Sequence, residues 1–138
     1  MRPIRPRVAG VLAVGCLIVA AFQAALALEA PLGAAAIGGT NSGQVPDGLR
    51  FLTALTALVW LLGTLVVLAR GGFALSPLPR VVATWGHLGS VCLLGTATLL
   101  SFASSSPWER FGWGPFSLVM LVLCISLARS RPPAGGTP

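Results

Sequence analysis

The side chains that could carry redox or metal chemistry are few and lie far apart along the chain. His87 is the only histidine, and Cys16, Cys92 and Cys124 stand singly, with no CxxC pair. A protein zinc site needs three or four His, Cys or carboxylate ligands, and structural sites usually draw them from paired motifs. We therefore expect no metal, no cofactor and no catalytic residue, and interpret the cysteines as small apolar fillers.

His87 is the strongest single candidate for chemistry because it lies within a long uncharged stretch. Ionisable groups inside a membrane are functional candidates by default. One hypothesis is therefore a redox or quinone-handling membrane enzyme that uses His87. The other is an imidazole hydrogen-bonded to a Thr, a Ser or a backbone carbonyl. We favour the second, because no acidic partner is expected at the same depth.

A second group of polar residues flanks the apolar stretches and could bind a small polar ligand or a lipid headgroup beneath the segment 29–49. The alternative is interface anchoring, in which Trp108 and Trp113 belong to an aromatic belt. In that case an ion pair of Glu29 or Glu109 with an arginine would tie the segment to the helices, contributing about 0–1 kcal/mol. The candidate ligand-binding residues are Gln23, Arg50, His87, Glu109 and Arg110.

These residues must be positioned by a very apolar chain. Of its 138 residues, 55% are hydrophobic and 9% are charged, and the mean hydropathy is +0.88. Soluble domains carry about 25% charged residues. So few charges cannot cover the surface of a soluble domain, and we expect the lipid bilayer to surround the protein.

Four apolar stretches are each close to the roughly 20 residues that cross a hydrocarbon core as a helix. Because a backbone in lipid must satisfy its own hydrogen bonds, each stretch should be helical. The sequence thus predicts an all-α transmembrane four-helix bundle, as one domain over residues 1–130 with a disordered tail at 131–138. The predicted spans are 8–28, 51–69, 81–103 and 107–128.

The start of the fourth span is marked by Ser106-Pro107-Trp108-Glu109. This pattern predicts a capping box, with Ser106 as the N-cap and Glu109 at the third helical position. Pro115 then lies inside the helix, and we expect it to bend the helix, eased by Gly112 and Gly114.

The positions of the charges predict the orientation. All three acids, Glu29, Asp47 and Glu109, fall on one side of the predicted membrane together with Arg50 and Arg110. Cytoplasmic segments are rich in Lys and Arg, so both termini are expected in the cytoplasm. The net charge of +6 is therefore a topology signal, and the scattered arginines exclude a nucleic-acid partner. The arginines on the cytoplasmic side are Arg2, Arg5, Arg7, Arg70, Arg80, Arg129 and Arg131.

The first span has an alternative interpretation as a secretory signal peptide. It has a basic start, and Ala25-Leu26-Ala27 has the small-x-small form of a cleavage site. The apolar run nevertheless continues to Leu28, which favours a retained span. The other three spans keep their orientation in either case.

Small residues recur along the first helix and, as a small-xxx-small pair, on the third. Such residues let helices pack closely in lipid. They motivate our leading hypothesis, a non-enzymatic structural or accessory membrane protein that contacts another copy of itself or a larger membrane-protein partner. The seam consists of Ala9, Ala13, Cys16, Ala20, Gln23 and Ala27, with Gly86 and Ser90 on the third helix.

Several short motifs together resemble those of a family of uncharacterised small tetraspan membrane proteins of actinobacteria and related bacteria. The resemblance implies a four-span protein of the bacterial cell membrane with an uncleaved first span, and it implies no activity. The motifs are Phe22-Gln23, Ala30-Pro31-Leu32-Gly33, Gly38-Gly39, Pro46, Leu49-Arg50, Ser106-Pro107-Trp108-Glu109-Arg110 and Trp113-Gly114-Pro115.

Overall fold

The computed structural model describes residues 4–73 and 78–130, and this part of the chain is all-helical. Four of its helical segments are long and apolar enough to cross a membrane. The predicted all-α four-helix fold is therefore confirmed. The elements are α1 (Ile4–Ala27), η1 (Gly33–Ala35), η2 (Ile37–Gly39), α2 (Asp47–Arg70), α3 (Arg80–Ala103), the π-helical turn η3 (Glu109–Trp113) and α4 (Gly114–Arg129).

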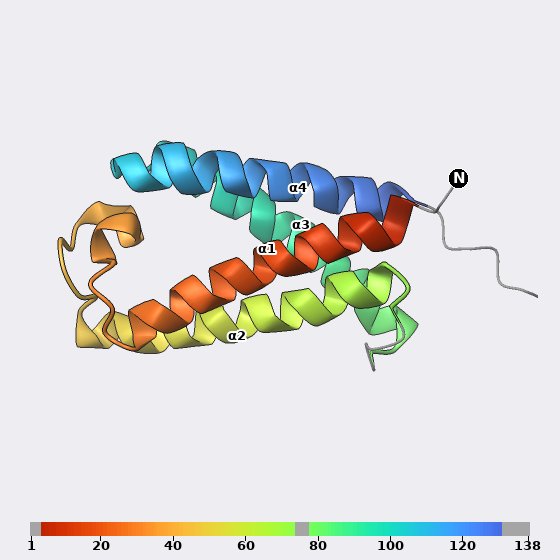
Figure 1. The fold of residues 1–138 in the computed structure, drawn as a ribbon, viewed down its shortest axis with the longest axis horizontal. Helices are drawn as coiled ribbons and strands as arrows, with labels where there is room; N and C mark the ends of the chain where they lie inside the picture. The colour runs from red at the N-terminus through yellow and green to blue at the C-terminus, as the bar shows by residue number, and fades with distance from the viewer. Residues whose placement is uncertain (1–3, 74–77, 131–138) are drawn as a thin grey trace, which may run out of the picture.

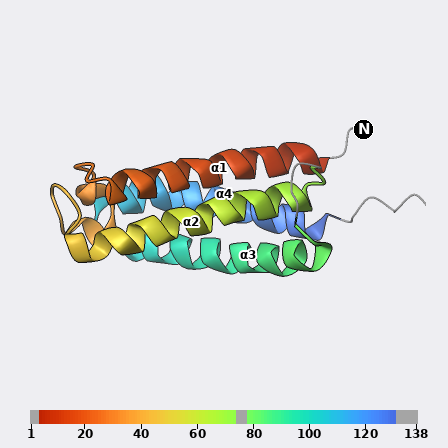
Figure 2. The same ribbon diagram turned by 90° about the horizontal axis from the view of Figure 1, so that it is seen from below.

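The four long helices lie side by side in an elongated bundle (Figures 1 and 2). The start of α1 and the end of α4 lie at one end, which we call the terminal end. The segment with η1 and η2 lies at the other, the loop end (Figure 1). The predicted tail 131–138 lies outside the described residues.

Most of the helices extend beyond the predicted spans. α2 begins at Asp47 and ends at Arg70, so it includes the charged residues that flank its apolar stretch. An acid in the first turn and a base in the last turn both interact favourably with the helix dipole. The helix therefore continues past the apolar stretch at both ends, where hydropathy alone does not predict it.

The start of the fourth helix differs in part from the predicted capping box. The Ser106 hydroxyl accepts the Glu109 N–H at 3.5 Å, as an N-cap should. The Glu109 carboxylate does not reach back to the Ser106 N–H, which instead donates to the Ser104 hydroxyl at 3.1 Å. The prediction of the second hydrogen bond of the capping box, from the Ser106 N–H to the Glu109 carboxylate, is therefore wrong. The Glu109 carboxylate instead accepts from Gly38, in a distant part of the chain.

The bend expected at Pro115 takes the form of a π-helical turn. The N–H of Gly114 donates to the carbonyl of Glu109, five residues earlier. Pro115 has no N–H to donate, so the helix has an irregular turn just before it. As a result, Glu109 and Trp113 are the first and last residues of one widened turn.

Small residues set the closest approaches between helices. α1 packs mainly on α2, and α3 packs mainly on α4. A Cβ atom at Gly15 of α1 would overlap the Met120 side chain of α4, and one at Gly71 would overlap Ala9. Gly71 therefore needs glycine for packing reasons, because the Cβ of Ala9 cannot move away, whereas the flexible end of Met120 can adjust to a Cβ at Gly15.

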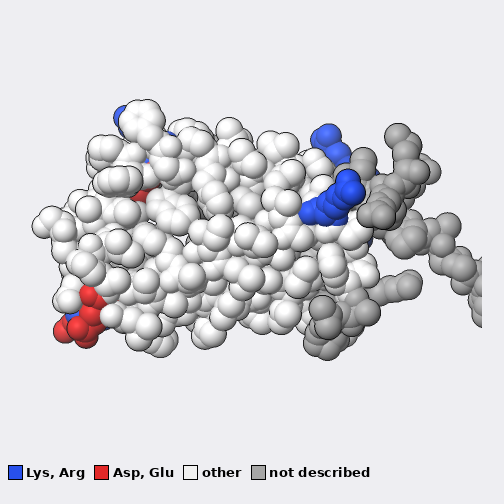
Figure 3. Space-filling view, in the orientation of Figure 1, with Lys and Arg blue, Asp and Glu red and all other residues white. Residues whose placement is uncertain are grey.

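The bundle has hydroxyls inside and large apolar side chains outside. Thr64 and Thr98 are buried, and each donates to a carbonyl one turn earlier in its own helix, at 3.0 Å and 2.7 Å. Leu99 and Phe51 are 73% and 77% exposed. Between its two ends the visible face carries almost no charge (Figure 3). The interior also buries an apolar core, so what differs from a soluble protein is the apolar outer surface, which suits helices surrounded by lipid.

The contact between Gly71 and Ala9 gives a direct test of the packing. We expect Gly71→Ala to lower the free energy of unfolding by about 1–3 kcal/mol, because the added methyl group overlaps Ala9. The measurement is unfolding in mixed micelles, followed by circular dichroism.

Gly10→Ala is the matched control. A Cβ there meets no atom within 4 Å, so the change should be neutral or stabilise the helix by about 0.5–1 kcal/mol. Adding Ala9→Gly to Gly71→Ala should restore part of the lost stability. Equal effects of Gly71→Ala and Gly10→Ala would contradict the packing described here.

Candidate functional site

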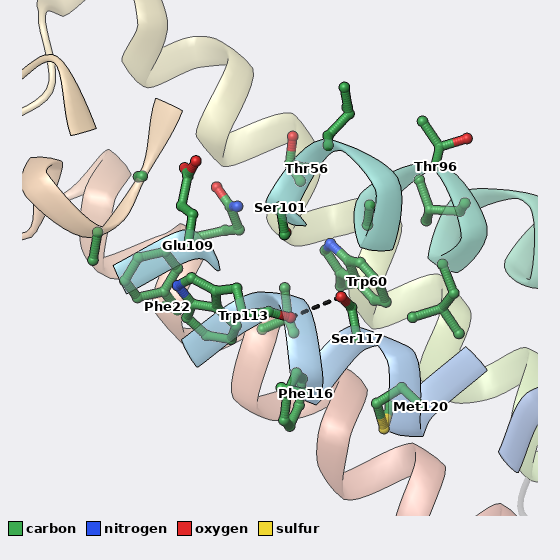
Figure 4. Close-up of a pocket in the computed structure, with 18 of the residues that line it drawn as sticks. Phe22, Thr56, Trp60, Thr96, Ser101, Glu109, Trp113, Phe116, Ser117 and Met120 are labelled. Atoms are coloured by element: carbon green, nitrogen blue, oxygen red, sulfur yellow. Dashed lines mark hydrogen bonds between the residues drawn. The ribbon is translucent and has the colours of Figure 1, made fainter. Parts of the chain in front are cut away.

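A cavity of about 290 Å³ lies in the loop-end half of the bundle. All four long helices contribute to its wall, and η1 and η2 lie over it (Figure 4). We call it the loop-end cavity. Its aromatic and polar wall residues include Phe22, Trp60, Trp113, Phe116, Ser101 and Glu109.

Helical spacing brings the wall residues of each helix to one face. Trp113, Phe116 and Met120 follow each other at intervals of three and four, so they share a face of the last helix. The ring centroids of Trp113 and Phe116 are 5.6 Å apart in an edge-on arrangement, and those of Trp113 and Phe22 are 4.7 Å apart. This aromatic group joins the end of α1 to the start of α4.

Hydrogen bonds within the helices leave the wall largely apolar. The Ser117 hydroxyl lines the cavity but donates to the Trp113 carbonyl at 2.7 Å (Figure 4). Gln23, Ser101 and Glu109 place polar groups at the loop end of the wall, and Thr96 adds a hydroxyl farther along it (Figure 4). The cavity therefore has a deep apolar part and a more polar end beneath the loop.

The loop that covers the cavity is tethered to the start of the last helix. Gly38 N–H donates to both carboxylate oxygens of Glu109, at 3.1 and 3.2 Å. The Ser106 hydroxyl donates to the Ala34 carbonyl at 2.9 Å. Gly38 has a φ of 72°, a conformation that favours glycine. η1 and η2 are thus held over the cavity through their own backbone groups, the Ala34 carbonyl and the Gly38 N–H, which bond Ser106 and Glu109.

The two arginines predicted near the site point elsewhere. Arg50 pairs with Glu29 at 2.6 Å and with Asp47 at 3.0 Å, which joins the end of α1 to the start of α2. Arg110 donates through Nε to the Phe102 carbonyl at 3.2 Å. Neither arginine lines the cavity. Of the expected ion pairs, the one between Glu29 and Arg50 is present.

His87 is 3% exposed and lies outside the lining of the loop-end cavity. Its Nε2 is 3.0 Å from the Cys124 carbonyl. Because a carbonyl can only accept, Nε2 carries the proton and donates it. The side chain therefore ties α3 to α4, as in the interpretation of an imidazole bonded to a backbone carbonyl.

The structure brings two of the five candidate ligand-binding residues, Gln23 and Glu109, to the cavity and leaves the other three outside its lining. Within residues 4–73 and 78–130, no three His, Cys, Asp or Glu side chains come close enough to hold a metal ion.

The small-residue seam is mostly buried inside the chain. Ala9, Ala13, Cys16 and Ala20 are buried, and Gln23 and Ala27 are half-buried. On α3, Gly86 and Ser90 are also half-buried, and a Cβ at Gly86 would lie 3.0 Å from Val66 of α2. The seam therefore packs against helices of the same chain.

The aromatic lining was not predicted from the sequence. Trp108 is 68% exposed, as an interfacial residue should be, whereas Trp113 turns inward and lines the cavity. The available signal was the spacing of Trp113, Phe116 and Met120, which predicts one shared face. Nothing in that spacing indicates that the face borders a cavity.

No family model, curated protein or solved structure matches the chain. The resemblance to small tetraspan bacterial proteins therefore rests on the motifs quoted above, and the site is interpreted from its own geometry.

The tether predicts the effect of removing the Ser106 hydroxyl. We expect Ser106→Ala to increase amide hydrogen exchange at least several-fold across residues 33–41, because the bond to the Ala34 carbonyl is lost. The measurement is hydrogen–deuterium exchange by mass spectrometry in micelles. Ser42→Ala, in the exposed part of the same loop, is the control and should leave the exchange unchanged. Identical exchange in the two variants would contradict the tether.

Proposed function

We propose that this chain is a multi-pass integral membrane protein that binds a small amphipathic molecule in the loop-end cavity. The observation that carries the proposal is a cavity of about 290 Å³ with aromatic walls, a polar end and a tethered cover. Binding sites for small molecules are typically clefts of roughly 300–1,000 Å³, mostly apolar with a few polar groups that fix orientation. The cavity lies close to the lower limit of that range, which suits a small ligand.

Two features support residence in a membrane. Four helices are long and apolar enough to span one, and their exposed faces carry large apolar side chains. The buried hydroxyls of Thr64 and Thr98 bond within their own helices, so they need no water. We propose the cytoplasmic membrane of a bacterium as the location, in agreement with the resemblance stated above.

Charge supports an orientation with both termini in the cytoplasm. Arg7, Arg70 and Arg129 lie toward the terminal end, whereas all three acids lie at the loop end. In the view of Figure 3, red atoms appear only toward the loop end. By the positive-inside rule the terminal end faces the cytoplasm, and the loop-end cavity lies in the outer half of the membrane.

The cavity favours binding over a purely structural role. The structural hypothesis was motivated by the small-residue seam, and that seam is occupied by α2 and α4 of the same chain. His87 likewise bonds the backbone of α4 and does not face the cavity. Binding in the cavity is therefore the function that the geometry supports best.

Binding can be followed through the tryptophans of the cavity. In a Trp85→Phe/Trp108→Phe background only Trp60 and Trp113 remain, and both line the cavity. We expect 4-bromo-neopentylbenzene, an apolar probe with a quenching bromine atom, to reduce their fluorescence in a saturable manner. The titration is made in uncharged maltoside micelles.

Two size-increasing variants separate binding from partition into the micelle. Ala97 lines the cavity, so Ala97→Phe should abolish the saturable quenching, whereas Leu99→Phe on the exposed face of α3 should preserve it. Quenching that rises linearly with the probe, or that survives Ala97→Phe, would count against the proposal.

The orientation is tested by labelling single cysteines in a Cys92→Ala background, since Cys16 and Cys124 are buried. A membrane-impermeant maleimide should label Ser42→Cys in intact cells, because position 42 lies in the exposed loop. Ser130→Cys should be labelled only after the cells are permeabilised. The opposite pattern would reverse the proposed topology.

A further inference from the structure

Resting on the proposed binding in the loop-end cavity, we infer that the ligand carries an organic cation, a quaternary ammonium or protonated amine attached to a compact apolar group. Three features of the cavity lead to this class of ligand. They are an unneutralised carboxylate, aromatic walls, and a groove that leads past the carboxylate to the outside.

The carboxylate of Glu109 lines the cavity without a cationic partner. Its hydrogen bonds come from a neutral group, the Gly38 N–H. Among the residues that the structure describes, both ion pairs involve Arg50, with Glu29 and Asp47, and neither includes Glu109. A negative charge is thus left at the polar end of the cavity, where it attracts a cation and repels an anion.

The walls provide surfaces that attract the same kind of ligand. Trp60, Trp113 and the two phenylalanines line the cavity, and no Arg is present among the lining residues that the structure describes. The faces of aromatic rings attract cations, and Trp is the most effective of them. Figure 4 shows Glu109 at one end of the cavity and Trp60 and Trp113 farther along it. An ammonium group can therefore lie beside the carboxylate while its apolar part contacts the rings.

A surface groove connects this end of the cavity to the outside. The groove runs between η2 and the end of α3, where Gly38 and Ser104 line it. Glu109, Ile37 and Ser101 line both the groove and the cavity. A cation that approaches from the loop end therefore passes Glu109 before it reaches the aromatic walls.

A pair of probes that differ only in charge tests the inference. 4-Bromobenzyl-trimethylammonium and 4-bromo-neopentylbenzene have the same shape, because a quaternary nitrogen replaces a quaternary carbon. Both quench Trp60 and Trp113 in the Trp85→Phe/Trp108→Phe background. We expect the cation to bind at least roughly ten times more tightly than the neutral probe, because the Glu109 carboxylate and the aromatic ring faces both attract its charge.

Glu109→Gln is the decisive variant, because it removes the charge and keeps an oxygen that can accept the Gly38 N–H. We expect it to weaken binding of the cation roughly tenfold, because the attraction of the carboxylate is lost, and to leave binding of the neutral probe unchanged. Unchanged neutral binding also shows that the cavity of the variant is intact.

The remaining outcomes separate the two proposals. If the neutral probe binds and the cation has no advantage, binding in the cavity stands and the inference of a cation is wrong. If the cation keeps its full advantage in Glu109→Gln, the inference that the Glu109 carboxylate selects the cation is wrong. If neither probe quenches in a saturable manner, the proposed function fails as well.

A competition experiment distinguishes a lipid headgroup from a free amine as the natural cation. A lipid headgroup and a free amine share the ammonium group but differ in the attached chain. Dodecyltrimethylammonium, kept below its micellar concentration, should compete with the brominated cation much better than tetramethylammonium if the natural ligand is a lipid. Similar competition by both compounds would instead assign the cavity to a small free amine.

Discussion

The structure depends first on each helix satisfying its own polar groups. The hydroxyls of Thr64 and Thr98 bond carbonyls one turn earlier, so these polar side chains can be buried without water or partners from another helix. The helices are then held together by close packing of small residues, such as Gly71 after α2 against Ala9 of α1. Toward the loop end, where Trp60 and Trp113 face inward, all four helices contribute to the wall of a cavity.

Much of the fold follows from hydropathy and charge alone. The four helices appear where apolar stretches of membrane-spanning length predict them, and Ser106 begins the last one as its N-cap. Local patterns suffice for these features, because a helix and its N-terminal cap involve residues that are close in sequence. The seam of small residues is also visible in the spacing along one helix, whereas the helices that it packs against are known only from the structure.

The cavity was less predictable because its parts come from distant segments. Glu109 and Gly38 are far apart in sequence, and the glycine-rich segment around Gly38 has no periodicity that would place it over the helices. The sequence offered arginines as partners for Glu109, but Arg50 is engaged by Glu29 and Arg110 by a carbonyl. Pro115 predicted an irregularity at the start of the last helix, but not that Trp113, the last residue of the π-helical turn, would line a cavity.

The bond between Glu109 and Gly38 has a consequence for sequence variation. Its donor belongs to the main chain, so this bond makes no demand on the exposed side chains of the loop. Substitutions should therefore be tolerated at exposed positions such as Thr40 and Ser42, but not at the buried Ala36 and Val45. Gly38, Gly39, Ser106 and Glu109 should vary together or not at all, because Gly39 lies against Ser106. These four positions form a compact signature by which distant relatives with diverged loops could be recognised.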